Sequence, residues 1–422
     1  AENVTVENVT FGDDACLEVN TSGRFTLKNC TFNGKTEVRT PVTLNVGSAT
    51  VTGNTFNGTK TDGTPAYYNA IEFAVNSGNK LSSSTLSDNI FEAAIKNNYF
   101  STYYYEDNAV ITAENNVIKL ANRGSNAIRI SNVTNSDVTF NLNNNSYTYV
   151  DNTSEYEGFI LLQDFTKKSG NAENFSKVTI NISNLTSPSD ASRLFYVWED
   201  SVGLVSDNNP VIKGDSSIEK FFAAKVGDTY YKTLADAVAA VQNGDTITLL
   251  KDVDLGNTVT VANKTVTLNM AGKTIYNTKD LWDSKLNAWS LISVRENGNL
   301  TITGDGTLKA KADDCYALDT QEGSAKLTVE NGTVIGNISA IYAFLGEVTI
   351  NGGSYSIQQL NTNNVQDGYG LTINCYDQNY KEKTAKITVT GGYFAHFDPA
   401  NNKAEGVGTN FVKDGYVSVT SD

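Results

Sequence analysis

Histidine, the residue most often used for acid–base chemistry near neutral pH, occurs once in this sequence, as His396. It follows Phe394 in a short aromatic stretch close to the end of the chain. A histidine on a terminal strand beside aromatic residues is more often a packing side chain than a catalytic one. We therefore expect His396 to be partly buried or to lie at a rim, without a catalytic role.

Two acidic doublets, Asp13–Asp14 and Asp313–Asp314, come directly after strand-like stretches. Grouped carboxylates could bind calcium, which prefers several oxygen ligands. Adjacent residues of a strand point to opposite faces, so a doublet supplies at most part of such a site. We therefore expect solvated charges at corners of the fold, and we predict no metal site and no cofactor.

Cleavage of a glycosidic bond would need two carboxyl groups roughly 5–10 Å apart on either side of that bond. Neighbouring strands lie about 4.8 Å apart, so residues that are distant in the sequence could form such a pair. Glu72, Asp319 and Glu330 are candidates, and the sequence gives no reason to prefer any of them. We predict no catalytic residue.

Aromatic residues give the stronger functional signal. Trp282 and Trp289 flank a polar insertion, and Tyr103, Tyr104 and Tyr105 form a run beside two acidic residues. Exposed rings with polar neighbours are typical of surfaces that bind sugars or proteins. We predict that these five residues bind a ligand. The alternative is that the rings pack long loops down onto the fold, although three consecutive tyrosines cannot all face inward.

The fold that positions these residues is indicated by short sequence repeats, which we call phrases. Each phrase consists of a strand with alternating apolar residues, a corner at Asn or Gly, and a second short strand. The second half holds LTITGDGTLKA (300–310), LTVENGTVIG (327–336), VTINGGSYSI (348–357) and ITVTGGYFAHF (387–397). The first half holds VTVENVTFGD (4–13), FTLKNCTFNG (25–34), ATVTGNTFNG (49–58) and STLSDNIFEA (84–93). Such degenerate repetition indicates a solenoid.

The repeats predict how successive coils stack. Phe11, Phe32, Phe56 and Phe91 occupy the same position of the phrase and should stack, and the corner asparagines could form a hydrogen-bonded ladder. An array of hairpins is the alternative, because Asn-Gly corners also favour hairpins. The variable intervals between phrases and their two very short strands favour the coil.

A helical stretch divides the chain. Leu234, Ala237, Val238 and Val241 form one apolar stripe, which predicts a helix over about 233–243. Solenoids need such an element to cover an apolar end. We therefore expect two domains: a first repeat region at 1–222, irregular in its middle, and a second, capped region at 223–422.

The bulk composition excludes several partners. The formal net charge is −15, and Lys and Arg are scattered, whereas nucleic-acid binding needs a positive stripe. No apolar run of about 18 residues is present, so no membrane insertion is expected. The four cysteines lack the spacing of a zinc site. Cys16 and Cys30 could form a disulfide in an exported protein, or could be small apolar side chains inside a coil.

Two segments carry a resemblance to a known family. YYKTLADAVAAVQNGDTITLLKDVDL (230–255) resembles a cap helix with a first coil, and GGYFAHFDPANNKAEGVGTNFVKDGYVSV (391–419) resembles a closing segment. Both are similar to right-handed parallel β-helix proteins of the pectin-lyase-like superfamily, and more narrowly to repeat-bearing surface proteins of gut bacteria. The resemblance implies an all-β, right-handed parallel β-helix solenoid, and we expect two tandem units with a short capping helix at about 233–243.

The resemblance specifies a fold more than an activity, because such proteins include polysaccharide lyases, glycosidases, adhesins and phage tail proteins. We expect a non-enzymatic, secreted or cell-surface bacterial protein that acts in adhesion and binds a polysaccharide or a host surface protein. The alternative is a polysaccharide lyase or glycoside hydrolase with a non-standard acidic site. A passive spacer is a third reading.

Overall fold

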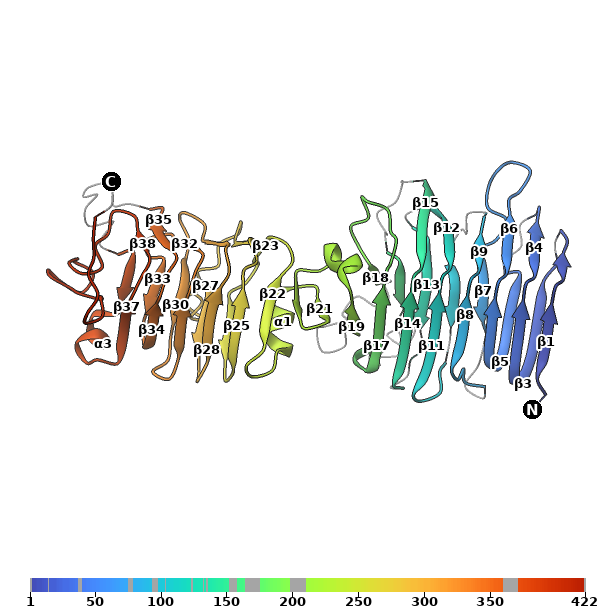
Figure 1. The fold of residues 1–422 in the computed structure, drawn as a ribbon, viewed down its shortest axis with the longest axis horizontal. Helices are drawn as coiled ribbons and strands as arrows, with labels where there is room; N and C mark the ends of the chain where they lie inside the picture. Colours follow the sequence, from blue (N-terminus) through green and yellow to red (C-terminus); the bar gives the residue numbers. More distant parts are fainter. Residues whose placement is uncertain are drawn as a thin grey trace. The chain divides into compact units, whose positions relative to one another are not determined.

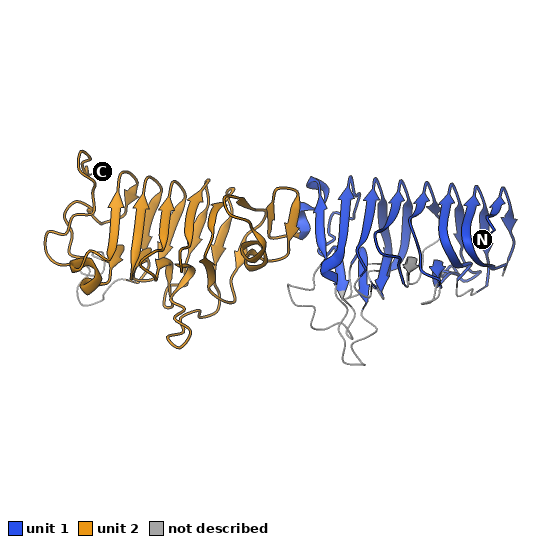
Figure 2. Ribbon diagram, turned by 90° about the horizontal axis from the view of Figure 1, so that it is seen from below, with its two compact units in different colours: residues 1–221 blue, residues 222–422 orange. Residues whose placement is uncertain are grey.

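The chain divides into two compact units, residues 1–221 and 222–422 (Figure 2). The structure, a computed structural model, describes residues 2–13, 15–36, 40–74, 79–92, 98–102, 104–122, 124–131, 133, 136–151, 158–163, 175–197, 210–359 and 371–420. Within each unit most strands pair in parallel with the strand one coil earlier and the strand one coil later (Figure 1). Each full coil adds one strand to each of three ladders, which we call first, second and third in chain order.

Unit 1 follows this plan from its first strand. Its first ladder holds β1 (Val4–Glu7), the later part of β3 (Leu17–Lys28), the later part of β5 (Val42–Thr52), β8 (Ser84–Ser87), β11 (Ala109–Glu114), β14 (Val138–Asn143), β17 (Val178–Ser183) and β19 (Val211–Gly214). Its second ladder holds β2 (Thr10–Phe11), β4 (Thr31–Gly34), β6 (Thr55–Gly58), β9 (Ile90–Phe91), β12 (Val117–Asn122) and β15 (Ser146–Asp151).

The third ladder of unit 1 shares two strands with the first. It holds the early parts of β3 and β5, then β7 (Asn69–Phe73), β10 (Asn98–Thr102), β13 (Asn126–Ser131), β16 (Ile160–Gln163) and β18 (Phe195–Val197). The pairing of β3 with β5 shifts register between Thr21 and Arg24, so each long strand serves two ladders. Two short 3-10 helices, η2 (Phe175–Lys177) and η5 (Ser216–Phe221), complete the unit.

Unit 2 repeats the same three-strand coil. Its first ladder holds β22 (Thr246–Leu249), β25 (Thr265–Asn269), β28 (Asn299–Thr303), β31 (Lys326–Val329), β34 (Gly346–Ile350) and β37 (Ala385–Val389). Its second holds β23 (Val253–Asp254), β26 (Thr274–Tyr276), β29 (Thr307–Lys309), β32 (Thr333–Gly336), β35 (Ser354–Ile357) and β38 (Tyr393–Phe394). Its third holds β24 (Val259–Ala262), β27 (Ser290–Arg295), β30 (Tyr316–Thr320), β33 (Ile341–Ala343) and β36 (Ile373–Cys375).

The repeated phrases of the sequence are the first strand, corner and second strand of successive coils. β31 and β32 make up the phrase at 327–336, and β34 and β35 make up the phrase at 348–357. Alternate residues of these strands are buried, as period two predicts. The chain is therefore an all-β protein with solenoid-like stacks of parallel strands, and the alternative of a hairpin array is wrong.

The predicted aromatic stack is confirmed in unit 1. The rings of Phe11, Phe32, Phe56 and Phe91 lie parallel, with successive centroids 4.5, 4.8 and 4.6 Å apart. These distances match the spacing of neighbouring strands, because each ring comes from one coil. Burial of these rings and of Phe25 and Leu27 forms the core of the first coils.

The predicted asparagine ladder is also confirmed in unit 1. Asn54 Nδ2 donates to Asn89 Oδ1 (2.9 Å), Asn89 Nδ2 to Asn116 Oδ1 (3.0 Å) and Asn116 Nδ2 to Asn145 Oδ1 (2.9 Å). Each backbone N–H in the ladder also donates to the next Oδ1, as Asn89 N does to Asn116 Oδ1 (3.1 Å). The preceding residue, such as Asp88 or Asn115, takes a left-handed φ of 57° or 56° and turns the chain.

Unit 2 turns the equivalent corner with glycine. Gly332, Gly353 and Gly392 have φ values of 100°, 90° and 111°. A Cβ on Gly353 would lie 2.7 Å from the carbonyl oxygen of Gly332 in the previous coil. Backbone therefore packs directly on backbone at this corner, where only glycine fits.

Unit 2 begins with an antiparallel hairpin, β20 (Ala224–Val226) and β21 (Thr229–Tyr231), followed by α1 (Leu234–Ala240). Thr233 caps α1, since its Oγ1 accepts from Asp236 N (3.0 Å). Leu234, Ala237 and Val238 are buried in the core of the unit. The predicted helix is confirmed, but it ends at Ala240 rather than at 243. Val241 already has extended backbone, with ψ at 138°.

The cysteines do not form disulfides. Cys16 is exposed, while Cys30, Cys315 and Cys375 are buried. Cys30 stands where the asparagine ladder begins, and its backbone N–H donates to Asn54 Oδ1 (2.9 Å). The sequence left two alternatives for Cys16 and Cys30, a disulfide or small apolar side chains inside a coil. The second alternative is correct for Cys30, which is buried. Among the described residues, no helix is long and apolar enough to cross a membrane.

Candidate functional site

The polar insertion between β26 and β27 is held in place by a buried carboxylate. Asp314 is 8% exposed, and its Oδ2 accepts from Leu281 N (2.7 Å) and Asn277 Nδ2 (2.8 Å). Its Oδ1 accepts from Trp282 N (2.9 Å). These charge-assisted hydrogen bonds fix the backbone on which Trp282 is mounted. Asp314 is thus a structural residue, and the prediction of solvated charges at this doublet is wrong for it.

The two tryptophans of the insertion lie against each other. Their ring centroids are 6.1 Å apart with an interplanar angle of 23°. Trp282 is 45% exposed, whereas Trp289 is half-buried. Trp289 Nε1 is buried and has no hydrogen-bond partner among the described residues. Trp289 therefore packs as a support, while Trp282 is the more exposed ring of the pair.

Further rings continue from these tryptophans across later coils. Trp282 meets the edge of Tyr316 (5.5 Å), and Tyr316 stacks on Tyr342 (4.7 Å). Trp289 meets the edge of Phe344 (5.8 Å), which contacts Tyr376 (5.1 Å). We call these six rings the aromatic strip: Trp282, Trp289, Tyr316, Tyr342, Phe344 and Tyr376.

The aromatic strip belongs to the third ladder of unit 2. Its residues precede β27, begin β30, lie in or directly after β33, and follow β36 (Figure 1). Tyr376 is 40% exposed, like Trp282 at the other end, and the rings between them are half-buried or buried. The strip therefore spans four successive coils, roughly 14 Å at the spacing of parallel strands.

A groove of about 340 Å³ adjoins Trp282 at the first end of the strip. Its lining comes from β24 and the loop before it, from the insertion, and from the end of β27: Gly256, Asn257, Thr258, Thr260, Asp280, Leu281, Trp282, Asp283, Leu286, Ala288 and Arg295. Arg295 is the only cation in that lining, and Asp280 and Asp283 are its carboxylates. A ring face beside hydroxyl, amide and carboxylate groups is the chemistry of a polyhydroxylated ligand site.

Asp319 lies beneath this surface with no exposed area. Burial raises its pKa to about 6, and hydrogen bonds from Ser293 and Gln321 limit the rise. Gln321 Nε2 donates to Asp319 Oδ2 (2.6 Å), and the charge of Arg295 also favours the ionised carboxylate. A carboxyl group without accessible surface cannot contact a substrate, so Asp319 supports the wall of the site.

Glu405 reaches the other end of the strip from the closing segment. Its Oε1 accepts from Cys375 N (2.6 Å), directly beside Tyr376. Burial raises the pKa of Glu405 to about 7, and the nearby Asp377 raises it further while Lys381 opposes the rise. The strip thus ends near a carboxyl group that changes charge close to neutral pH.

The predicted tyrosine run lies in unit 1 of the chain. Tyr105 has no exposed surface and packs edge-on against Phe140 in unit 1, with centroids 5.8 Å apart. Its ring belongs to the core and cannot contact a ligand. Tyr104 is half-buried and has a left-handed φ of 58°. Tyr103 lies outside the described residues.

The other candidate carboxylates are kept apart. Glu72 lies on β7 in unit 1, where its Oε2 accepts from Thr40 Oγ1 (3.3 Å). Glu330 follows β31, at the end of the first ladder of unit 2, and its Oε1 accepts from Asn351 Nδ2 (2.9 Å). Asp319 belongs to the third ladder. Within unit 2, Asp319 has no exposed surface and therefore does not form an accessible catalytic pair with Glu330.

Asp13 and Asp313 each form an ion pair. Asp13 pairs with Lys35 (3.4 Å), and both are exposed, as a solvated corner charge would be. Asp313 pairs with Lys311, whose Nζ also lies 2.9 Å from Asp280 Oδ1. Asp14 lies outside the described residues. Among the described residues, no group of three or more His, Cys, Asp or Glu side chains could hold a metal ion.

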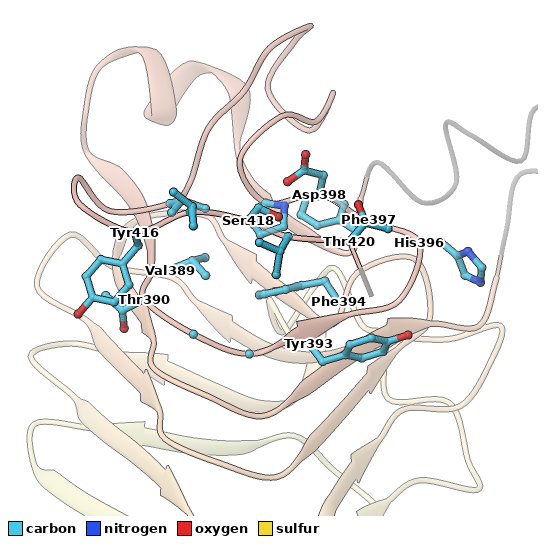
Figure 3. A pocket seen from close by; sticks show the side chains of 16 residues that line it. Val389, Thr390, Tyr393, Phe394, His396, Phe397, Asp398, Tyr416, Ser418 and Thr420 are labelled. Carbon is cyan, nitrogen blue, oxygen red and sulfur yellow. The ribbon is translucent and has the colours of Figure 1, made fainter. Parts of the chain in front are cut away.

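A second hollow, of about 670 Å³, lies at the last coil of unit 2 (Figure 3). Phe394, Phe397 and Asp398 line it together with the exposed tail residues Tyr416 and Val419. His396 is exposed at its edge with a φ of 53°, in line with the predicted rim position. Part of the wall of this hollow is therefore formed by an irregular tail, whereas the aromatic strip lies along the strands of the third ladder.

Sequence reasoning missed most of the aromatic strip. Tyr316, Tyr342, Phe344 and Tyr376 stand singly in the sequence, 26 to 34 residues apart between coils, and none forms a run. A usable signal was nevertheless present, because an aromatic residue recurs at or beside β27, β30, β33 and β36, the third strands of four successive coils. Neither a protein-family model nor a curated protein matches this chain.

Proposed function

We propose that this chain is a non-enzymatic, secreted or cell-surface protein that binds glycan chains along the aromatic strip of unit 2. The carrying observation is the strip itself, with Trp282 and Tyr376 exposed at its two ends. Apolar C–H faces of sugar rings stack on such rings, while neighbouring polar groups bind the hydroxyls. An adhesive role at a bacterial surface agrees with this chemistry.

The proposal includes the finer fold. We take each unit to be a right-handed parallel β-helix of the pectin-lyase-like kind, in tandem, because each coil supplies three parallel strands in a fixed order. Crossover connections between parallel strands are right-handed in nearly all proteins, which supports that hand. A solenoid face that adds one strand per coil suits a polymeric ligand better than a small molecule.

A glycan array tests this function. We expect the wild-type protein to bind, and the Trp282→Ala/Trp289→Ala variant to lose at least tenfold in affinity, because truncation of a central aromatic pair commonly costs about 2 kcal/mol or more. Tyr393→Ala is the matched control, since Tyr393 is 57% exposed on β38, outside the strip. Absence of binding to glycans and mucin by the wild type would contradict the proposal.

Hydrolysis is the second candidate function, and one observation favours it. Asp319 and Glu405 both have raised pKa values, and they lie on either side of Tyr342, which pairs with Asp319 in register. Raised carboxyl pKa values are typical of general acids. The burial of Asp319 weighs against this function. New reducing ends, or unsaturated uronate absorbance, after incubation with a polysaccharide panel would support it over simple binding.

A further inference from the structure

We infer that the aromatic strip and its groove take a neutral polysaccharide laid along the stacked coils, and that they discriminate against chains containing uronates. This inference rests on the proposed glycan binding and narrows it to one chemical class. Three features of the described residues support it. The strip runs across successive coils, the nearby cations already interact with groups of the chain itself, and carboxylates lie at both ends of the strip.

The direction of the strip indicates a chain rather than a single sugar. Consecutive rings come from consecutive coils, as the parallel pairing of β27, β30, β33 and β36 requires. The strip is roughly 14 Å long, so its two exposed end rings, Trp282 and Tyr376, can contact different sugar units of one chain. Because Trp282 and Tyr376 at its ends are the most exposed rings, the chain can continue beyond either end.

The single cation of the groove is already engaged. Arg295 Nε donates to Ser293 Oγ (3.0 Å), and Arg295 Nη2 donates to the carbonyl oxygen of Asn287. Its charge also acts on the buried Asp319, whose ionised form it favours. A guanidinium held in this way has little capacity to form the bidentate pair that recognises a carboxylate ligand.

The lysines near the strip stand close to carboxylates of the chain itself, and one of them, Lys311, forms ion pairs. Lys311 lies between Asp280 and Asp313. Lys381 acts on Glu405, whose pKa it lowers against the effect of burial. Lys279 and Lys285 are exposed in the insertion, where they balance Asp280 and Asp283 in formal charge.

Carboxylates stand at both ends of the strip. Asp280 and Asp283 line the groove at the Trp282 end, and Asp377 and Glu405 lie at the Tyr376 end. Carboxylates accept hydrogen bonds, so they suit the many hydroxyl donors of a neutral sugar. Lys311 offsets Asp280, so repulsion of a uronate chain comes mainly from Asp283, Asp377 and Glu405 and, over longer distances, from the formal net charge of −15.

Paired polymers test the inference. A neutral β-glucan, a galactan and a mannan are each compared with their own derivative oxidised at C6 to the uronate, by titration calorimetry at low and high salt. We expect at least one neutral polymer to bind, and its oxidised derivative to bind about tenfold more weakly at low salt. High salt should narrow that difference, because screening weakens repulsion between exposed charges.

Two variants sharpen this test. Asp280→Asn/Asp283→Asn should improve binding of the oxidised polymer severalfold while leaving the neutral polymer bound. Glu330→Gln/Glu347→Gln, which removes two charges from the first ladder of the same unit, should leave the ratio unchanged. Equal or tighter binding of the oxidised polymer by the wild type would overturn the inference but leave glycan binding intact. Binding of none of the six polymers would overturn the inference, and failure on the full array would remove the proposed function as well.

Discussion

Unit 1 and unit 2 turn the same corner of the coil in two different ways. In unit 1 the corner places an asparagine inside, and Asn54, Asn89, Asn116 and Asn145 form one buried hydrogen-bonded ladder. In unit 2 the corner has no side chain at Gly353 and Gly392, and backbone packs on backbone. The comparison shows that the same corner can be stabilised in two ways. An asparagine ladder connects many coils by hydrogen bonds, whereas a glycine corner depends on close packing between two adjacent coils.

Substitutions in the asparagine ladder and at the glycine corners should destabilise the protein in different ways. A buried polar ladder is cooperative, because each amide both donates to one neighbour and accepts from another. A glycine corner is local, because a new Cβ clashes only with the adjacent coil. The following predictions, from the largest expected effect to the smallest, test that difference.

Asn89→Ala should cost unit 1 about 3–5 kcal/mol of stability, because it removes the acceptor for both Asn54 N and Asn54 Nδ2 and the donor to Asn116. Hydrogen exchange should show lost protection over several coils. Asn45→Ala is the matched control, since Asn45 belongs to a shorter and more exposed amide row, in which it donates to Asn20 and accepts from Asn79. A loss confined to one coil would contradict the cooperative ladder.

Gly353→Ala should destabilise unit 2 by about 2–4 kcal/mol, because a left-handed φ and a 2.7 Å approach to the Gly332 carbonyl oxygen must both be accommodated. Gly53→Asn in unit 1 is the counterpart. Its φ of 67° suits asparagine, and the nearest obstacle is the side-chain oxygen of Asn29, which can move. Calorimetry should show a large change for the first variant and less than about 1 kcal/mol for the second.

Asp314→Ala should loosen the insertion of unit 2 at a cost of about 1–3 kcal/mol, since three donors lose their acceptor. Faster proteolytic cleavage between β26 and β27 is the expected readout, together with weaker glycan binding. Asp314→Asn keeps one acceptor oxygen and should give an intermediate result. Unchanged cleavage would show that the tryptophan contacts alone hold the insertion.

The units should also respond differently to pH. In unit 2, burial raises the pKa of Glu405 from 4.5 to about 7, so the folded state binds more protons than the unfolded state between these values. Stability of unit 2 should therefore fall as pH rises through that window, and Asp319 acts in the same direction between 3.8 and about 6. Hydrogen bonds lower the pKa values of Asp62 and Asp215 in unit 1, so these residues destabilise unit 1 only in stronger acid.

Melting of each unit at pH 5 and pH 7.5 measures this difference. We expect the melting temperature of unit 2 to be higher at pH 5 by roughly 2–4 °C relative to unit 1. Glu405→Gln should reduce that difference, because the amide does not ionise. An unchanged difference in this variant would mean that Glu405 keeps an ordinary pKa in the folded protein.

The sequence by itself was enough to predict the repeating coil of parallel strands and the residues that recur in it. Period-two alternation, corner Asn and Gly, and recurring Phe residues predict the parallel strands, the stack from Phe11 to Phe91 and the asparagine ladder, because a repeat places the same residue at the same point of each turn. It also predicted α1, and it pointed to Trp282 and Trp289. These features depend on local pattern and spacing.

Only the tertiary structure decided which side chains meet outside the repeated phrases. In the folded chain Tyr105 is buried, and the Asp314 carboxylate accepts hydrogen bonds from the backbone of the insertion. Tyr316, Tyr342 and Tyr376 lie in one strip with the tryptophans. Loop length varies from coil to coil, so the position of a residue in the sequence does not fix its height or direction on the outer surface. Contacts made by stacking are decided by register, which exists only once the coils are assembled.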